Sequence, residues 1–446
     1  MAPLLFGSIR KNSGMIEPQS NWAGSYTYSA ARLHYPETLQ QVRELVIRSS
    51  KLRVLGSRHS FNSIADTPED MVSLDRFGHA DDVLALDPER LSVTVDANIK
   101  YGQLCGQLHR EGYALHNLAS LPHISVAGAC ATATHGSGDR HGNLATAVSA
   151  MEIVTADGDM VVLSRDQYNT QSEGGEQFLG AVVGLGGFGV VTKLTLDIVP
   201  TFDMRQDVYE NLPLTQVEEH FDEIVSKAYS VSLFTDWQNE RVNQVWLKSH
   251  IADEATLELE PELFGATLAP THRHPIPGFS ARACTPQMGI PGPWHERLPH
   301  FRMDFTPSSG DELQSEYLVP RQHAVAAFRA IHRLRNQVAP LLQISEVRTV
   351  AADNLWISPC YRQTCVAIHF TWKKNWEAVR QLLPLIEEEL APLNARPHWG
   401  KLFTMQAPRV GALYPRLADF QRLLSLYDPR GKFRNAFLDT YIFGGN

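Results

Sequence analysis

The stretch Leu52-Arg-Val-Leu-Gly56-Ser-Arg-His59-Ser-Phe-Asn62 joins an apolar run to a loop of small and hydroxyl residues. Its first four residues predict a β-strand that ends at Gly56, where the lack of a side chain permits a sharp turn. The backbone N–H groups after the turn can converge on a phosphate oxygen. Ser57 and Ser60 add hydroxyl donors, and Arg58 adds a positive charge. Taken alone, this loop has at least even odds of being an ordinary turn.

A second loop, residues 118–138, contains glycines, alanines and hydroxyl residues and almost no bulky side chain. Such a segment packs poorly on itself but lets the backbone approach a flat ligand closely. Two loops of this kind in one chain favour a bound cofactor that carries phosphate.

The two loops together resemble the FAD-binding domain of the vanillyl-alcohol-oxidase (PCMH) type, and the chain is most similar to the alditol oxidases. The resemblance includes the strands near Glu346 and His369, the segment that ends at Lys401 and the ending Asp-Pro-Arg-Gly-Lys-Phe, and it is weakest over residues 251–302. It implies an α+β fold in which a two-part FAD-binding domain carries an α+β substrate (cap) domain with an antiparallel sheet. FAD is therefore the expected cofactor.

In this family the histidine of the first loop is bonded covalently to the flavin, and here that position is His59. Some relatives add a second link through a cysteine of the second loop. Residues 118–128 contain no cysteine, and Cys130 lies beyond the matching place, so we expect a single link through His59. The residues expected to contact FAD are His59, Gly56, Ser57, Arg58, Ser60, Ala119, Ser120, Ser125, Gly128, Thr134, His135, Gly136, Ser137 and Val190.

Two strands in the second half of the chain present charged side chains. In Leu342–Val350, Glu346 and Arg348 are two residues apart and therefore project from one face. The strand over residues 364–372 has one apolar face, so His369 and Thr371 point the other way, towards water or a cleft. A solvated face is the alternative, but a histidine between small residues favours a site.

Lys401 follows a tryptophan and a glycine, which makes partial burial of its charge plausible. The resemblance implies that Glu346, Arg348, His369, Thr371 and Lys401 line a polyol site, together with Ser120. It also implies that the small Ala119 lets dioxygen reach the flavin. We expect Lys401 and Arg348 to stabilise an alkoxide and Glu346 and His369 to hold neighbouring hydroxyls. His369 and Lys401 are alternative acceptors of the substrate proton.

The run Gly184-Leu-Gly-Gly-Phe-Gly189 fits the dinucleotide fingerprint G-x-G-x-x-G, which requires a strand before it and a helix after it. Here residues 176–183 read as a helix and residues 190–199 as a strand, which is the reverse order. We therefore expect a turn with close backbone packing, and a backbone that lies near a cofactor is the alternative.

The whole chain has 446 residues and a net charge of −9, with no basic block, which argues against nucleic acid and anionic membranes as partners. The longest uncharged apolar stretch is too short to cross a membrane. Residues 1–12 do not resemble a secretory signal, and five cysteines form no C-x-x-C pair. We expect a cytoplasmic protein, a monomer, whose partners are a small polyol and dioxygen.

The expected organisation is an FAD-binding domain over residues 1–200, a cap domain over 201–405 and a C-terminal return to the first domain over 406–446. The proline-rich stretch 251–302 could form a lid or a rim beside the substrate. The rival functions are an aldonolactone oxidase or dehydrogenase and a flavin-binding protein without turnover. A metal site at His272 and His274 is not expected, because no carboxylate or cysteine stands at ligand spacing.

Overall fold

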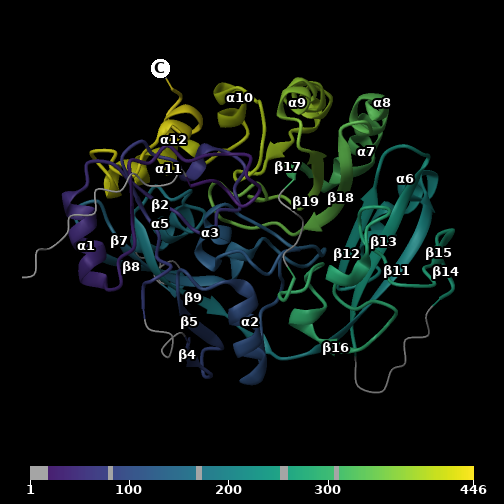
Figure 1. The fold of residues 1–446 in the computed structure, drawn as a ribbon, viewed down its shortest axis with the longest axis horizontal. Helices are drawn as coiled ribbons and strands as arrows, with labels where there is room; N and C mark the ends of the chain where they lie inside the picture. The colour runs from purple at the N-terminus through teal and green to yellow at the C-terminus, as the bar shows by residue number, and fades with distance from the viewer. Residues whose placement is uncertain (1–18, 79–83, 167–172, 252–259, 306–310, 446) are drawn as a thin grey trace, which may run out of the picture.

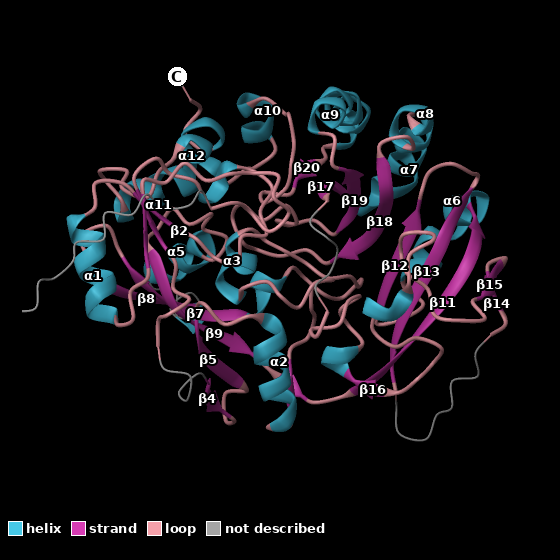
Figure 2. Cartoon of the chain, viewed as in Figure 1, coloured by secondary structure: helices cyan, strands magenta, loops and turns pink. Residues whose placement is uncertain are grey.

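The computed structural model describes residues 19–78, 84–166, 173–251, 260–305 and 311–445. The N-terminal residues considered above as a signal lie outside these ranges. The fold is α+β, with a three-stranded and a five-stranded sheet on one side and a ten-stranded sheet on the other (Figures 1 and 2), besides one two-stranded pair. No helix in the described ranges combines the length and the apolarity that crossing a membrane would require.

The first sheet is parallel and positions the loop at residues 56–62. Its strands have the order β1-β3-β2 and are β1 (Arg32–His34), β2 (Leu52–Val54) and β3 (Asp70–Val72). Helix α1 (Leu39–Arg48) connects β1 to β2, and the Thr38 side chain caps its N-terminus by accepting from Gln41 N. This cap explains why the helix starts at Leu39.

The second sheet is antiparallel with the order β4-β5-β9-β7-β8. Its strands are β4 (Leu84–Asp87), β5 (Ser92–Asp96), β7 (Val148–Val154), β8 (Met160–Ser164) and β9 (Val190–Asp197). The hairpin of β7 and β8 turns through Gly158 at positive φ, as its Asp-Gly pair predicts. The helices of this part are α2 (Tyr101–Arg110), α3 (Val126–Ala131) and α5 (Glu173–Ala181), and a short β6 (Tyr113–Ala114) pairs with β10 (Val199–Pro200).

The large sheet has ten strands in the order β14-β15-β11-β13-β12-β18-β19-β17-β20, with β16 paired to β11. They are β11 (Asp203–Pro213), β12 (Ser230–Thr235), β13 (Arg241–His250), β14 (Glu262–Leu263), β15 (Ala266–Leu268), β16 (Gly292–Pro293), β17 (Glu312–Pro320), β18 (Leu342–Val350), β19 (Cys365–Lys373) and β20 (Arg396–Pro397). Helices α6 (Leu214–Val225), α7 (Ala324–Arg333), α8 (Arg335–Val338) and α9 (Trp376–Leu390) lie along its outer side (Figure 1).

The last helices, α10 (Ala407–Ala412), α11 (Leu417–Tyr427) and α12 (Ala436–Tyr441), follow the large sheet in sequence. Helix α11 packs on α5, so the end of the chain lies beside its first half (Figure 1). The largest cluster of buried apolar side chains includes members of both antiparallel sheets, such as Val93 and Ile368.

The helix before the glycine run, the strand after it and the strands that carry Glu346 and His369 all form where the sequence predicts them. Because α5 precedes Gly184 and β9 follows Gly189, the reversed order is confirmed. Both faces of β19 are buried from Cys365 to Trp372, so the second face turns towards a cleft and not towards water.

Candidate functional site

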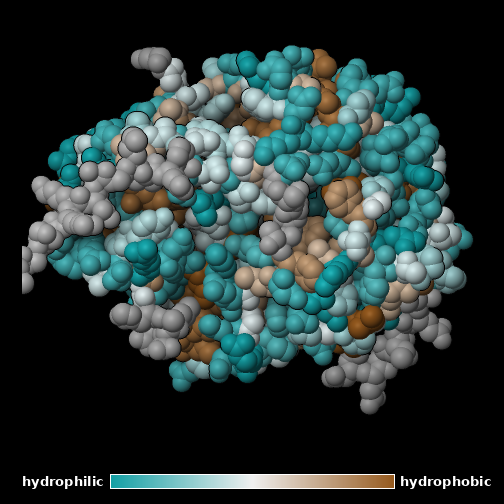
Figure 3. Space-filling model, viewed as in Figure 1, coloured by the Kyte–Doolittle hydropathy of each residue, from teal (hydrophilic) through white to brown (hydrophobic). Residues whose placement is uncertain are grey.

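A cavity of 1080 Å³ lies between the loops of the first half and the inner face of the large sheet. It is lined by the loop at residues 56–61, by much of the loop at 118–138 and by side chains of β17, β18 and β19. The proline-rich stretch contributes several lining residues, among them His274, Phe279, His300 and Phe301. Apolar surface gathers near the middle of the face seen in Figure 3.

The two loops of the first half are tied together by their serines. Ser125 N donates to Ser57 Oγ over 3.0 Å, and Ser57 N lies 3.4 Å from Ser125 Oγ. Arg58 has a φ of 62°, a left-handed conformation that turns successive N–H groups to one side. In the described part of the chain, the N–H groups of Gly56, Arg58, His59 and Ser60 donate to no protein acceptor. They are available to the oxygens of a phosphate.

Gly56 and Gly128 leave room for the Ser125 hydroxyl, which lies between the two loops. A Cβ atom at Gly56 would lie 2.9 Å from Ser125 Oγ, and one at Gly128 would lie 2.7 Å from it. Both distances are shorter than carbon–oxygen contact allows, so no larger residue fits without displacing the serine. The free N–H groups and this cradle fit the diphosphate of FAD.

His59 is half-buried on the cavity wall, with its ring stacked on Trp22 at a centroid distance of 5.4 Å. Its Nδ1 is enclosed and has no hydrogen-bond partner in the described residues. Burial lowers the pKa of His59 to about 4, so the ring is neutral near pH 7. A neutral imidazole nitrogen with no partner is a competent nucleophile.

The structure brings most of the residues expected to contact FAD to the cavity wall. The lining includes Gly56, Ser57, Arg58, His59, Ser60, Ala119, Ser120, Ser125, Gly128, Thr134 and His135. Three others lie behind this wall. Ser137 donates to the Val231 carbonyl, Gly136 is packed against the Leu118 carbonyl, and Val190 belongs to a buried apolar cluster.

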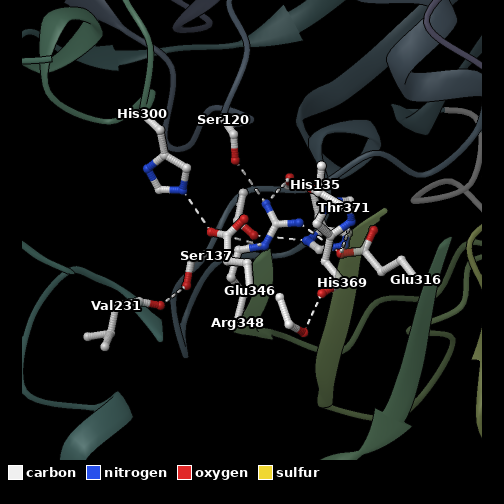
Figure 4. A network of polar contacts seen from close by, with 12 residues as sticks. Ser120, His135, Ser137, Val231, His300, Glu316, Glu346, Arg348, His369 and Thr371 are labelled. Carbon is white, nitrogen blue, oxygen red and sulfur yellow. Dashed lines mark hydrogen bonds and ion pairs between the residues drawn. The ribbon is translucent and has the colours of Figure 1, made fainter. Parts of the chain in front are cut away.

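The opposite wall carries a buried network of charges centred on Glu316 of β17 (Figure 4). Glu316 Oε2 lies 2.6 Å from Lys401 Nζ, and Glu316 Oε1 lies 2.8 Å from Arg348 Nη2. His135 Nε2 approaches Oε1 to 3.4 Å. Burial alone would raise the pKa of Glu316, but the charge of Lys401 and the contacts with His135 and Arg348 outweigh it and hold this pKa well below its usual value. Glu316 is therefore ionised throughout the physiological range.

Strand register explains how these side chains meet. Glu316 on β17 stands opposite His369 on β19, which stands opposite Glu346 on β18. Opposite residues of antiparallel strands point to one face, so the three side chains form a row across the sheet. Arg348 lies two residues after Glu346 on the same face of β18, and its Nε lies 3.6 Å from Glu346 Oε1.

Lys401 joins His369 to this network. Lys401 Nζ lies 2.9 Å from His369 Nδ1, and His369 Nε2 lies 3.1 Å from Thr371 Oγ1. Burial and the charge of Lys401 lower the pKa of His369 well below its usual value, so the ring is neutral. Because an ammonium only donates, Nδ1 accepts and Nε2 carries the proton that is donated to Thr371.

The sequence did not identify Glu316. It also did not identify Lys248 and His300, two buried side chains that can carry a positive charge. His300 Nε2 lies 2.7 Å from Glu346 Oε1, and Lys248 Nζ lies 3.0 Å from His300 Nδ1. The alternation Glu312, Gln314 and Glu316 on one face of an otherwise apolar strand was a usable signal for β17. The proline-rich stretch has no regular pattern that would have identified His300.

Residues 30–164 match the family model described as FAD binding domain, and residues 310–441 match the model of D-arabinono-1,4-lactone oxidase. Over 95% of its length the chain is 47% identical to an alditol oxidase of Streptomyces sp., of which 99% is covered. The chain belongs to the alditol oxidase family.

Other relatives of this alditol oxidase family member are less similar in sequence. It is 28% identical to an L-gulono-1,4-lactone dehydrogenase of Mycobacterium tuberculosis, over 94% of this chain and 97% of that one. A crystal structure of cholesterol oxidase from B. sterolicum superposes with a TM-score of 0.73 at 13% identity, covering 99% of this chain and all of that one. The fold is thus that of vanillyl-alcohol-oxidase-type flavoproteins, and FAD is the cofactor.

Proposed function

We propose that this protein oxidises the terminal primary alcohol of alditols such as xylitol and sorbitol to the aldose, with dioxygen reduced to hydrogen peroxide. One observation carries the proposal. The buried Glu316 network faces the same cavity as the FAD loops, in a chain that is 47% identical to an alditol oxidase. When bound, FAD supplies the acceptor for a hydride from the carbinol carbon.

Lys401 is the residue best placed to stabilise negative charge on the substrate oxygen. An ammonium has three N–H groups, of which Glu316 and His369 engage two. The third is available for the alcohol oxygen. In a site closed to water, a fixed donor of this kind stabilises a developing alkoxide strongly.

His369 is the proposed acceptor of the hydroxyl proton. Its ring is neutral, and its Nδ1 is bonded only to Lys401 among the donors described. As the substrate hydroxyl gives its proton to Nδ1, the N–H of Lys401 is released and turns to the alkoxide oxygen. The proton therefore ends on the imidazole, and the ammonium of Lys401 balances the negative charge of the alkoxide oxygen.

Glu346, Arg348, Thr371 and Ser120 are proposed to hold the remaining hydroxyls and so to fix the carbinol carbon. All four line the cavity, and Arg348 Nη1 lies 3.3 Å from Ser120 Oγ, which links the sheet to the FAD loop. Ala119 beside Ser120 is small enough to leave dioxygen a path to the flavin.

We further propose that FAD is attached covalently through His59 alone. Cys130, the cysteine nearest in sequence to the second loop's contact region, is buried against Tyr101 and does not line the cavity. All five cysteines are buried and free, which supports a reducing, cytoplasmic location. The monomeric state stays a prediction.

The test is anaerobic mixing of the purified protein with xylitol, following loss of the oxidised flavin absorbance. We expect rapid bleaching in the wild type and a reduction rate lower by a factor of about 100 to 1,000 in Lys401→Met, as for loss of one oxyanion donor. Lys193→Met, which removes an exposed lysine of β9, is the matched control and should react like the wild type. An unchanged rate in Lys401→Met would remove this residue from the mechanism.

A lactone is the second candidate substrate, because residues 310–441 match the model of D-arabinono-1,4-lactone oxidase. A panel of xylitol, sorbitol, glycerol and gulonolactone with peroxide detection separates the two. A higher kcat/KM for gulonolactone than for every alditol would favour the lactone reaction.

A further inference from the structure

Three buried side chains form a hydrogen-bonded chain that ends in the site. Lys248 of β13 donates from Nζ to the Leu298 carbonyl and lies 3.0 Å from His300 Nδ1. His300 Nε2 lies 2.7 Å from Glu346 Oε1. Lys248 is only 1% exposed and does not line the cavity, so it can reach a ligand only through His300.

The position of the proton on His300 follows from its two partners. Burial and the charge of Lys248 lower the pKa of His300 to about 4, so the ring is neutral. Burial lowers the pKa of Lys248 to about 7. In the ammonium form, which predominates below that pH, Lys248 has N–H groups only, so Nδ1 must accept from it. The ring proton then lies on Nε2 and is donated to Glu346. Lys248 thereby selects the tautomer that Glu346 requires.

Because of this donation, the two carboxylate oxygens of Glu346 differ in their hydrogen-bond partners. Oε1 accepts from His300 and lies 3.6 Å from Arg348 Nε. Oε2 has no hydrogen bond within the described ranges, although Glu346 lines the cavity. Oε2 is therefore the oxygen available to a ligand hydroxyl.

The backbone at His300 reaches the FAD loop as well. His300 N and Phe301 N both donate to the Ser120 carbonyl, over 3.1 Å and 3.3 Å. A single residue of the proline-rich stretch thus contacts the FAD loop through its backbone and the substrate-facing strand β18 through its ring.

We infer that Lys248 and His300 are positioning residues that hold the Glu346 carboxylate so that its second oxygen accepts a hydrogen bond from the hydroxyl next to the reacting carbon. The inference rests on the proposed oxidation of a polyol, because only such a substrate offers that hydroxyl. It adds Lys248, which lies outside the cavity lining, and His300, which lines the cavity and acts through Glu346.

A double-mutant cycle on kcat/KM for xylitol tests this inference. His300→Leu removes the donor to a buried carboxylate and should lower kcat/KM by a factor of about 10 to 100. In the Glu346→Ala background the same change should have an effect of less than about twofold, because no oxygen remains for His300 to orient. His300→Gln, whose amide N–H can replace Nε2–H, should restore most of the activity.

Lys248→Met should lower kcat/KM about tenfold in the wild type and leave the Glu346→Ala protein unchanged, by the same coupling argument. His295→Gln, on the same stretch but outside the cavity lining, is the matched control and should behave like the wild type. If the loss of kcat/KM in each double variant equals the product of the losses in its two single variants, His300 and Lys248 act through general packing. That result would overturn the inference.

Nitrogen-15 NMR of labelled histidines gives a readout that does not depend on turnover. The wild-type signal that disappears in His300→Gln should show a bare Nδ1 and a protonated Nε2, and in Lys248→Met the resonance of its bare Nδ1 should shift because Nδ1 no longer accepts a hydrogen bond. If Lys248→Met leaves that signal unchanged, the inference is wrong. Failure of every alditol to bleach the wild-type flavin would instead refute the proposed function, and the NMR result would still decide the tautomer step.

Discussion

At the level of single residues, Glu316 holds the two cations of the site in place, because Lys401 and Arg348 each bond one of its oxygens. Glu316→Gln would leave both cations buried without this counter-charge. Removing one partner of a buried ion pair costs about 3–5 kcal/mol, so we expect a loss of that size in the free energy of unfolding, measured by urea denaturation. Glu218→Gln breaks the exposed pair with Arg329 and should cost at most about 1 kcal/mol.

The pH dependence of this loss has a definite sign. The pKa of Glu316 is lowered by folding, so its stabilisation is present above the usual carboxylate pKa and disappears only as the pH falls through the folded value. The difference between the wild type and Glu316→Gln should therefore be constant from about pH 6 to 8 and shrink only in acid below about pH 4. A difference that grew on acidification would contradict the assignment of an ionised Glu316.

His59 gives the second prediction at this scale. Because its ring is neutral and its Nδ1 has no partner, we expect acid-denatured wild-type protein to retain yellow flavin in the pellet. In His59→Ala the flavin should pass into the supernatant, whereas His123→Ala, a nearby histidine outside the lining, should keep it in the pellet. Flavin that washes out of the wild type would refute the covalent link.

How far the sequence predicts the site depends on whether a residue's partners are local. Glu346, Arg348, His369 and Thr371 were identifiable because alternation along one strand assigns a side chain to a face. The role of Glu316 arises only when β17 pairs with β19, a register that no pattern within one strand encodes. The same limit applied to Lys248, whose partner lies 52 residues away in the sequence.

At the level of elements, the glycine run between α5 and β9 forms a turn, and its residues Leu185, Gly186 and Gly189 also line the cavity. Gly189 has a φ of 139°, and a Cβ atom there would lie 2.2 Å from the Val154 carbonyl on β7. The sequence predicted this turn because the helix precedes the glycines and the strand follows them, an order visible in local patterns.

Gly189→Ala should therefore destabilise the fold by both backbone strain and overlap, by about 3 kcal/mol or more, measured by thermal or urea unfolding. Gly112→Ala is the matched control, because Gly112 also has a positive φ of 84° but has free space around it. It should cost only about 1 kcal/mol. Equal losses in the two variants would show that backbone strain, not contact with β7, explains the glycine.

At the level of the whole molecule, the end of the chain closes the region that carries the first FAD loop. The Asp428 carboxylate accepts from Lys432 N and Phe433 N, which shapes the turn after α11. Leu52 N donates to the Lys432 carbonyl, and the buried Arg53 donates from Nη1 to the Phe433 carbonyl. Strand β2, which leads into the FAD loop, is thus held by residues almost 400 positions later.

Deletion of residues 428–446 should therefore abolish FAD retention even though every residue lining the cavity remains. Without Phe433 the guanidinium of Arg53 loses one of its carbonyl acceptors, and leaving a buried charged group short of partners costs at least 1–3 kcal/mol. The measurement is the ratio of flavin to protein absorbance after gel filtration, with unfolding followed by circular dichroism. Removal of residues 444–446 alone is the control and should leave both unchanged. Full flavin loading of the longer deletion would show that β2 and its loop form without the C-terminal segment, and would refute the proposed return of residues 406–446 to the FAD-binding part.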